Sequence, residues 1–264
     1  MNYKKIILWS VIVAFGGFLF GFDTAVISGA EQEIQNLWNL SDTMIGQTVA
    51  MALYGTIIGA LLGGFPSETF GRKKTLLIVA ILFLISAIGS ALSLEVYSLM
   101  FFRFIGGLAV GASSVVAPMY ISEISPANKR GQLTALFQFN IVIGILISYL
   151  SNYFIGGASE GNWRIMLGIE IIPAVLFLFL ILFVPRSPRW LILKKGLIEE
   201  AKSVLKEIDP SEVENNITLI KLSKENSESS VGFKEFFSGK FNLPISLAFL
   251  IAFFNQLSGI NAVI

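Results

Sequence analysis

The stretch IILWSVIVAFGGFLFGFDTAVISG at residues 6–29 decides the fold class, because it is apolar almost throughout and carries a single charged residue, Asp23. About 20 apolar residues in a helix are enough to cross the hydrocarbon core of a bilayer. A basic start precedes the stretch, as in a signal peptide, but the apolar run is longer than such peptides have and lacks an obvious cleavage site. The stretch therefore predicts a retained first transmembrane helix.

Apolar stretches of spanning length recur along the rest of the chain. They cover roughly residues 44–65, 75–94, 96–121, 132–155 and 164–184, and a seventh runs from about 242 to the last residue. The 264 residues are 54% hydrophobic and only 14% charged, whereas soluble globular chains carry about 25% charged residues. The composition therefore predicts an all-α membrane protein that crosses the bilayer several times.

The segments between these stretches alternate in charge. One set holds every Lys and Arg of the chain except Arg103 and Arg164, and it includes the N-terminus and the long segment 185–240. Cytoplasmic loops of membrane proteins carry the excess of Lys and Arg. We therefore expect a multi-pass protein of the plasma membrane whose N-terminus and 185–240 segment are cytoplasmic.

Three parts are predicted along the chain: a six-helix transmembrane bundle at 1–184, a cytoplasmic helical linker at 185–240, and the start of a seventh transmembrane helix at 241–264. In the linker, GLIEEAKSVLKEID predicts an amphipathic helix that covers the bundle, with one apolar face formed by Leu197, Ile198, Ala201, Val204, Leu205 and Ile208. In the second and fourth spans, glycines four residues apart predict close helix packing; they are Gly55, Gly59, Gly63, Gly107 and Gly111.

The absence of two residue types excludes several kinds of chemistry. The chain has no cysteine and no histidine, so it offers neither thiol chemistry nor the commonest metal ligand. The serines in GASS at 111–114 could suggest an intramembrane hydrolase, but a serine nucleophile needs a base such as histidine. We therefore predict no enzyme, no metal site and no cofactor.

The net charge of +1 gives no indication of a nucleic-acid partner, and nothing in the sequence indicates an oligomeric state.

Three ionisable residues lie within the spans away from their ends: Asp23, Arg103 and Glu170. A charged side chain near the middle of a membrane helix costs roughly 2.5–3.5 kcal/mol. Counting residues from the span ends places all three at a similar depth, in the outer half of the membrane. They could form a fixed ion pair that holds helices together or a titrating site for protons, and position alone leaves both open.

Amide side chains also recur in the spans, and they are Gln138, Asn140, Asn255, Gln256 and Asn261. Each sugar hydroxyl both donates and accepts hydrogen bonds, and an amide offers both functions. These residues are therefore candidates for contact with a sugar.

Five motifs in order along the chain resemble those of the sugar porter family of the major facilitator superfamily. They are FGFDTAVISGA at 20–30, GGFPSETFGRKK at 63–74, RFIGGLAVGASSVVAPMYISEISPANKRG at 103–131, VPRSPRW at 184–190 and NQLSGIN at 255–261. The resemblance implies the N-terminal six-helix bundle of that superfamily, followed by cytoplasmic helices and part of a seventh transmembrane helix. It also implies transport of a monosaccharide, a hexose or a pentose, by alternating access between the two sides of the membrane.

The resemblance also implies roles for individual residues. Asp23 matches the proton site of the family's symporters, with Arg103 biasing its ionisation and Glu170 close by, so that a proton is the coupled partner. The substrate-binding positions match Gln138, Gln256, Asn261 and, with an altered side chain, Asn255. A charge network that closes the cytoplasmic gate matches Glu68, Arg72, Glu123, Arg130 and Arg189. Because the family has twelve helices in two halves, we expect this chain to be part of a longer protein and not to transport alone.

Four residues depart from the family pattern. Thr69 replaces an arginine and Arg186 a glutamate in the gate motifs, which weakens the assignment of salt bridges there. Ile145 and Asn255 stand where glutamines are common, which leaves the identity of the sugar open. A proton-independent uniporter is the main alternative function. A sugar sensor of the same fold is a further one, but sensors typically carry long cytoplasmic extensions and the segment before the first span is short.

Overall fold

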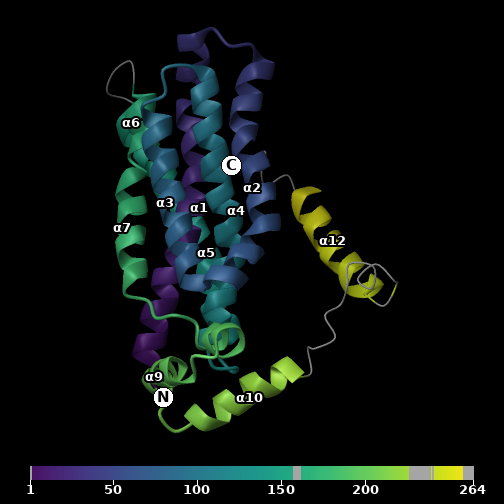
Figure 1. Cartoon of the computed structure of the whole chain (residues 1–264). Helices are drawn as coiled ribbons and strands as arrows, with labels where there is room; N and C mark the ends of the chain where they lie inside the picture. Colours follow the sequence, from purple (N-terminus) through teal and green to yellow (C-terminus); the bar gives the residue numbers. More distant parts are fainter. Residues whose placement is uncertain (1, 157–161, 226–238, 240, 258–264) are drawn as a thin grey trace. The chain divides into compact units, whose positions relative to one another are not determined.

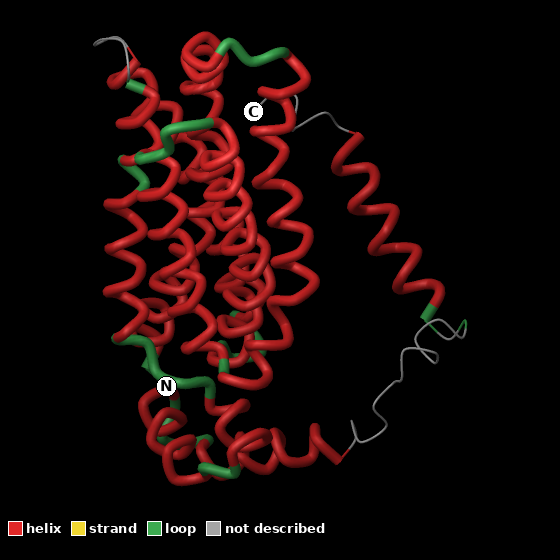
Figure 2. Tube along the Cα trace, turned by 45° about the horizontal axis from the view of Figure 1, so that its top comes forward, coloured by secondary structure: helices red, strands yellow, loops and turns green. Residues whose placement is uncertain are grey.

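The computed structural model describes residues 2–156, 162–225, 239 and 241–257, and these residues form helices and loops without a strand (Figures 1 and 2). The chain divides into two compact units, Met1–Ile217 and Thr218–Ile264. The first unit contains the helices α1 (Tyr3–Trp38), α2 (Asp42–Phe70), α3 (Arg72–Ala91), α4 (Val96–Ile124), α5 (Arg130–Gly156), α6 (Trp163–Gly168), α7 (Ile171–Leu182), α8 (Pro188–Trp190) and α9 (Ile198–Ile208), with a π-helical turn, η1, at Leu191–Lys195. Helix α10 (Val213–Glu225) crosses the boundary, and α12 (Asn242–Leu257) belongs to the second unit.

The first unit is a bundle built around α1 and α4. In the described part of the chain, six helical segments are long and apolar enough to cross a membrane, with α6 and α7 together forming the sixth. Helix α2 packs mainly against α4, α5 packs mainly against α1, and α3 lies against α4 and α7 (Figure 1). The helices α1 and α4 are the most buried, whereas most apolar side chains of α2 and α5 face outward. The predicted all-helical membrane fold is confirmed.

Local sequence explains where several of these helices begin. The Ser41 side chain accepts a hydrogen bond from the main-chain nitrogen of Met44 and so caps the start of α2. Glu95 and Ser98 form a reciprocal capping box at the start of α4. Gly71 separates α2 from α3 with a φ of +91°, a conformation that glycine adopts far more readily than other residues.

Glycines allow the helix backbones of the bundle to touch. A Cβ atom on Gly107 of α4 would lie 2.0 Å from the Ala52 carbonyl oxygen of α2, and one on Gly59 of α2 would lie 2.3 Å from the Leu108 carbonyl oxygen of α4. These are two of the glycines whose spacing predicted close packing. The contact between α2 and α4 is therefore made by main chain against main chain.

Two helix boundaries differ from the sequence prediction. The first span was expected at 6–29, but α1 continues to Trp38, so most of the polar segment after Gly29 is helical. The sixth span was expected to be continuous over 164–184, but it is interrupted between Gly168 and Ile171. Pro173 explains the interruption, because it has no N–H to donate to the Ile169 carbonyl and its ring clashes with that carbonyl in a regular helix. The Ile172 N–H donates to this carbonyl instead, at 3.1 Å.

The chain segment after α7 covers the end of the bundle at which the chain begins, which we call the N-terminal end. Helix α9 is amphipathic as predicted and buries Ala201, Val204, Leu205 and Ile208. The N–H of Asn2 donates to the Ile208 carbonyl at 2.7 Å, which joins α9 to the start of α1. Leu197 was predicted on the buried face but is 44% exposed. It precedes the first helical residue and therefore does not share the helical face.

The second unit contains the predicted seventh apolar segment. Helix α12 begins at Asn242, where the sequence prediction placed the start of this segment, and is described to Leu257. Residues 258–264, with the predicted sugar contact Asn261, lie outside the described residues.

Candidate functional site

Asp23 and Arg103 form a buried ion pair inside the bundle. Asp23 lies in the middle of α1 and Arg103 in the first half of α4, and their side chains are each 2% exposed. The Arg103 Nη1 atom lies 2.7 Å from Asp23 Oδ1. Both Nη1 and Nη2 also donate to the main-chain carbonyl of Asp23, each at 3.1 Å. The guanidinium is therefore held by the backbone of α1 as well as by the carboxylate.

A missing side chain on α4 makes room for this pair. A Cβ atom on Gly106 would lie 3.3 Å from Asp23 Oδ1 and 2.5 Å from the Ser86 hydroxyl oxygen. The Ser86 hydroxyl donates to the Phe102 carbonyl at 2.8 Å and thereby fixes α3 against α4 beside the pair. Glycine at this position lets α1, α3 and α4 converge on the carboxylate.

Glu170 brings a second carboxyl group to the same place. It lies at the interruption between α6 and α7, is 2% exposed, and its side chain lies close enough to the Asp23 carboxyl for the two groups to interact electrostatically. The three residues that the sequence placed at a similar depth thus lie close together in the structure. We call Asp23, Arg103 and Glu170 the charge cluster.

Three atoms of the charge cluster are buried without a hydrogen-bond partner among the described residues. They are Asp23 Oδ2, Glu170 Oε1 and Arg103 Nε. Two ionised carboxylates cannot donate to each other, and one guanidinium cannot balance two negative charges. A proton on either acid would make the cluster neutral and supply a donor between the two carboxyl groups. The arrangement is therefore chemically suited to take up and release one proton.

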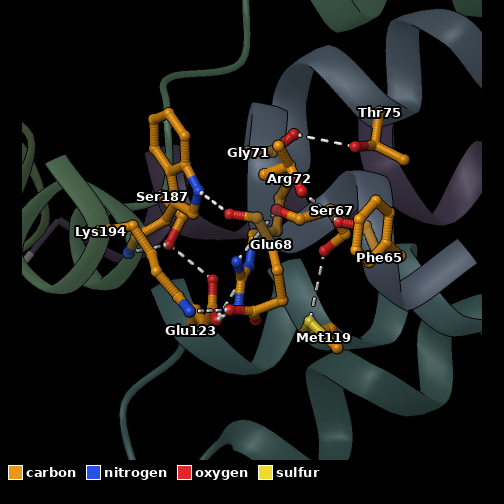
Figure 3. A network of polar contacts seen from close by, with 12 residues as sticks. Phe65, Ser67, Glu68, Gly71, Arg72, Thr75, Met119, Glu123, Ser187 and Lys194 are labelled. Atoms are coloured by element: carbon orange, nitrogen blue, oxygen red, sulfur yellow. Dashed lines mark hydrogen bonds and ion pairs between the residues drawn. The ribbon is translucent and has the colours of Figure 1, made fainter. Parts of the chain in front are cut away.

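A second charged network joins the helices at the N-terminal end of the bundle (Figure 3). Arg72, at the start of α3, lies at its centre with a side chain that is 7% exposed. Its Nη2 atom is 2.9 Å from Glu123 Oε1 on α4 and 2.8 Å from Glu68 Oε1 on α2. Its Nη1 atom donates to the Ser67 carbonyl at 3.1 Å. One arginine therefore links α2, α3 and α4.

Residues after α7 complete this network. The Ser187 hydroxyl donates to Glu123 Oε2 at 2.5 Å, and Lys194 Nζ lies 3.0 Å from Glu68 Oε2 (Figure 3). The Trp190 indole N–H donates to the Glu68 carbonyl at 2.8 Å. Sequence analysis missed these three contacts. The motif that contains Ser187 and Trp190 was recognised, but only its charged residues were considered as partners.

Two of the five predicted gate residues are placed differently. Arg130 and Arg189 are exposed, and neither forms an ion pair within 4 Å in the described part of the chain, although the charge of Arg189 still acts on Glu123.

The two residues that depart from the family's gate motifs make other contacts. Thr69 donates to the Phe65 carbonyl of its own helix at 2.9 Å. Arg186 lies 3.5 Å from Glu200 in an exposed pair.

The predicted sugar contacts are described only in part. Gln138 is exposed on α5, while the neighbouring Asn140 donates to the Leu136 carbonyl of its own helix at 2.8 Å. Ile145 packs against the bundle core. The backbones of Asn255 and Gln256 belong to α12, and their side chains lie outside the described residues.

Comparison with known proteins gives consistent matches over nearly the whole chain. Residues 9–264 match the family model of the sugar (and other) transporters. The D-xylose transporter of Levilactobacillus brevis is 40% identical over 255 residues, covering 95% of this chain and 55% of that protein. The arabinose-proton symporter of Bacillus subtilis is 37% identical over 270 residues, covering 98% and 57%. The chain thus spans slightly more than half the length of these curated relatives.

Solved structures show the same fold. The xylose transporter XylE from E. coli, in a partially occluded inward open conformation, superposes with a TM-score of 0.87 at 36% identity, covering 98% of this chain and 65% of that chain. The proton:xylose symporter XylE bound to 6-bromo-6-deoxy-D-glucose, described as a protein of the major facilitator superfamily, gives a TM-score of 0.84 at 37% identity, covering 89% and 56%.

Proposed function

We propose, on the premise that this chain belongs to the sugar (and other) transporter family, that the full-length protein carries a monosaccharide across the membrane together with a proton. The family is one of transporters and not of enzymes. The observation that carries the proton-coupled part of the proposal is the buried charge cluster, in which two acids share one arginine.

The proton would be the coupled ion because the charge cluster changes its net charge when it binds one. With both acids ionised the cluster carries one negative charge in a buried place, and with one proton bound it is neutral. A buried charge that is not balanced is costly. Loading with a proton would therefore lower the cost of states in which the cluster is sealed from water. Release would occur where water can reach it.

The substrate we propose is a pentose or a hexose. Among relatives of similar identity, one is named for D-xylose, one for arabinose and one for glucose. Gln138 faces outward from the bundle on α5, where it is free to meet a ligand or another part of the full-length protein. Asn255, Gln256 and Asn261 remain proposed sugar contacts by their match to the motif.

We further propose that the network around Arg72 closes one end of the transport path, and that this end is cytoplasmic with the N-terminus beside it. The network ties α2, α3 and α4 to the segment after α7. Such a tie would hold this end shut in one state and break in the other. The excess of Lys and Arg at this end supports the cytoplasmic orientation, and a plasma-membrane location follows from the proposed uptake role.

Sugar uptake into proteoliposomes tests the proposed symport. Full-length protein would be given radiolabelled D-xylose, L-arabinose or D-glucose with the lumen one pH unit more alkaline than the outside. One pH unit supplies about 1.4 kcal/mol per proton, enough for about tenfold accumulation with one proton per sugar. We expect at least one sugar to accumulate and a protonophore to abolish the accumulation. Equal concentrations on both sides, unaffected by the gradient, would show a uniporter.

Replacing Gln138 by alanine tests the sugar site. A hydrogen bond lost in a desolvated site typically costs about 1–3 kcal/mol, so the dissociation constant of the transported sugar should rise about 5- to 150-fold. Isothermal calorimetry on the full-length protein measures this directly. Gln132→Ala is the matched control, since Gln132 is an exposed glutamine earlier on α5. An unchanged affinity in Gln138→Ala would remove this residue from the site.

A further inference from the structure

A small pocket at the N-terminal end of the bundle is lined by cations. Its lining includes Lys73 and Lys74 from the first turn of α3 and Arg186 from the segment after α7, together with Phe70 and Trp190. Arg72 and Ser187 of the Arg72 network form its inner side, and no acidic residue lines it in the described part of the chain. We call the group of Lys73, Lys74 and Arg186 the basic pocket.

The positive charge of the basic pocket is not balanced by the neighbouring network. In that network the two acids, Glu68 and Glu123, are already matched by Arg72 and Lys194. Among the described residues, neither lysine of the basic pocket has an acidic partner within 4 Å. The two lysines therefore remain as positive charges without an acidic partner, next to Arg186, whose partner is Glu200.

Two of the three cations, Lys73 and Arg186, have contacts of their own, and neither contact uses the whole side-chain charge. Lys73 Nζ donates one hydrogen bond to the Leu182 carbonyl at 2.7 Å, which leaves two of its three N–H groups. Arg186 lies close enough for its charge to repel that of Lys73. The ion pair of Arg186 with Glu200, at 3.5 Å, has both side chains exposed. Exposed ion pairs of this kind contribute little free energy. With Glu200 as the one acid paired to three cations, the site keeps an excess of positive charge, which favours a bound anion.

The surroundings indicate that this anion belongs to a lipid. Phe70, Leu182 and Phe183 lie at the ends of spanning helices next to the cations and are exposed by 52%, 51% and 66%. Exposed apolar side chains beside cations mark the level at which the hydrocarbon region meets the headgroups. A soluble anion would gain nothing from the apolar residues, whereas a phospholipid would contact both groups.

We propose that the basic pocket binds the phosphate of an anionic phospholipid, with Lys73, Lys74 and Arg186 as its ligands. The pocket has room for only about one water molecule, so the phosphate would lie at its mouth, close to the network around Arg72, because Arg72 and Ser187 also line the pocket. This site is separate from the charge cluster, and its test measures binding instead of transport.

Lipid titration of delipidated full-length protein, followed by native mass spectrometry, tests the proposal. The probes are phosphatidylglycerol, zwitterionic phosphatidylcholine, and soluble glycerol 3-phosphate. A cation near an anionic lipid surface contributes about fivefold in affinity per unit charge. We expect Lys73→Gln and Lys74→Gln each to weaken phosphatidylglycerol binding about fivefold, and Arg186→Glu, which changes the charge by two units, to weaken it about 30-fold.

Lys206→Gln is the matched control, because Lys206 is an exposed lysine at the same end of the bundle but outside the basic pocket. It should leave the affinity within twofold. Equal binding of both lipids, or an equal loss in Lys206→Gln, would overturn the proposal. Binding of glycerol 3-phosphate as tight as that of phosphatidylglycerol would assign the pocket to a soluble anion instead. If Arg186→Glu does not fold, the Lys74→Gln variant, at an exposed position, tests the proposal.

Discussion

Replacing Asp23 by asparagine is expected to abolish the accumulation of sugar driven by a pH gradient while sugar exchange between the two sides continues. Asparagine keeps the shape of the side chain and an oxygen that can accept from Arg103, but it cannot bind and release a proton. In proteoliposomes with a pH difference of one unit, accumulation should fall from about tenfold to none. Exchange of labelled for unlabelled sugar by the full-length variant measures the transport activity that remains.

The charge cluster explains why this variant should still fold. Two of the three hydrogen bonds between Arg103 and Asp23 go to the main-chain carbonyl, which the substitution leaves in place. Glu170 remains close enough for its charge to interact with that of Arg103. The double variant Asp23→Asn, Glu170→Gln removes both acids and leaves Arg103 as an unbalanced buried charge, so its folded yield should drop sharply.

Asp42→Asn is the matched control, since Asp42 is a carboxylate at the exposed start of α2 where its side chain accepts only from Gln35 among the described residues. It should transport like the unaltered protein. The symport proposal fails if Asp23→Asn still concentrates sugar. A purely structural ion pair would show itself differently, because the single variant would then lose folded protein together with exchange.

The second large effect is expected from Gly107→Ala, which adds one methyl group at the contact of α2 and α4. That methyl would lie 2.0 Å from the Ala52 carbonyl oxygen and 2.9 Å from the Thr56 nitrogen. Both atoms are main chain, so no side chain can rotate away and the helices must separate. Overpacking typically costs 1–3 kcal/mol, and we expect about 3 kcal/mol here. Thermal unfolding of the detergent-solubilised protein should show a clear fall in the midpoint.

Gly64→Ala provides the control on α2 itself. A Cβ atom there meets nothing within 4 Å, and alanine is the better helix former by about 1 kcal/mol. Its unfolding midpoint should stay the same or rise. If both variants unfold at the same temperature as the unaltered protein, the backbone contact of α2 and α4 does not carry the stability that we assign to it.

The membrane fold was predictable because its signals are long and additive. Six apolar stretches, four-residue glycine spacing and ordered motifs all indicated the same bundle, and the family predicted from them is confirmed. Counting residues predicted a similar depth for Asp23, Arg103 and Glu170, since each helical residue adds about 1.5 Å of rise. Depth does not show which side chains meet, and only the family resemblance implied that the three lie close together.

The details that were not predicted depend on single residues whose effect is local. Pro173 interrupts the sixth span, but its apolar neighbours made the stretch look continuous. Ser187, Trp190 and Lys194 join the Arg72 network through contacts between residues that are far apart in the sequence, and a linear pattern of charges does not show which side chains meet. The family resemblance implied that Arg130 and Arg189 belong to the network, and the structure leaves both side chains exposed.

The interruption of the sixth span also has a mechanical consequence. Because the Ile169 carbonyl bonds to Ile172 and residue 173 has no N–H to offer, the two segments α6 and α7 meet at a joint where bending breaks no regular helical bond. Glu170 lies at this joint, facing Asp23 of the uninterrupted α1. A tilt of α7, whose N-cap is Glu170, against α6 would therefore alter the separation of the two carboxyl groups while each segment keeps its internal hydrogen bonds. Since the repulsion between two charges varies inversely with their separation, such a change of angle at the joint would change the electrostatic energy of the two acids.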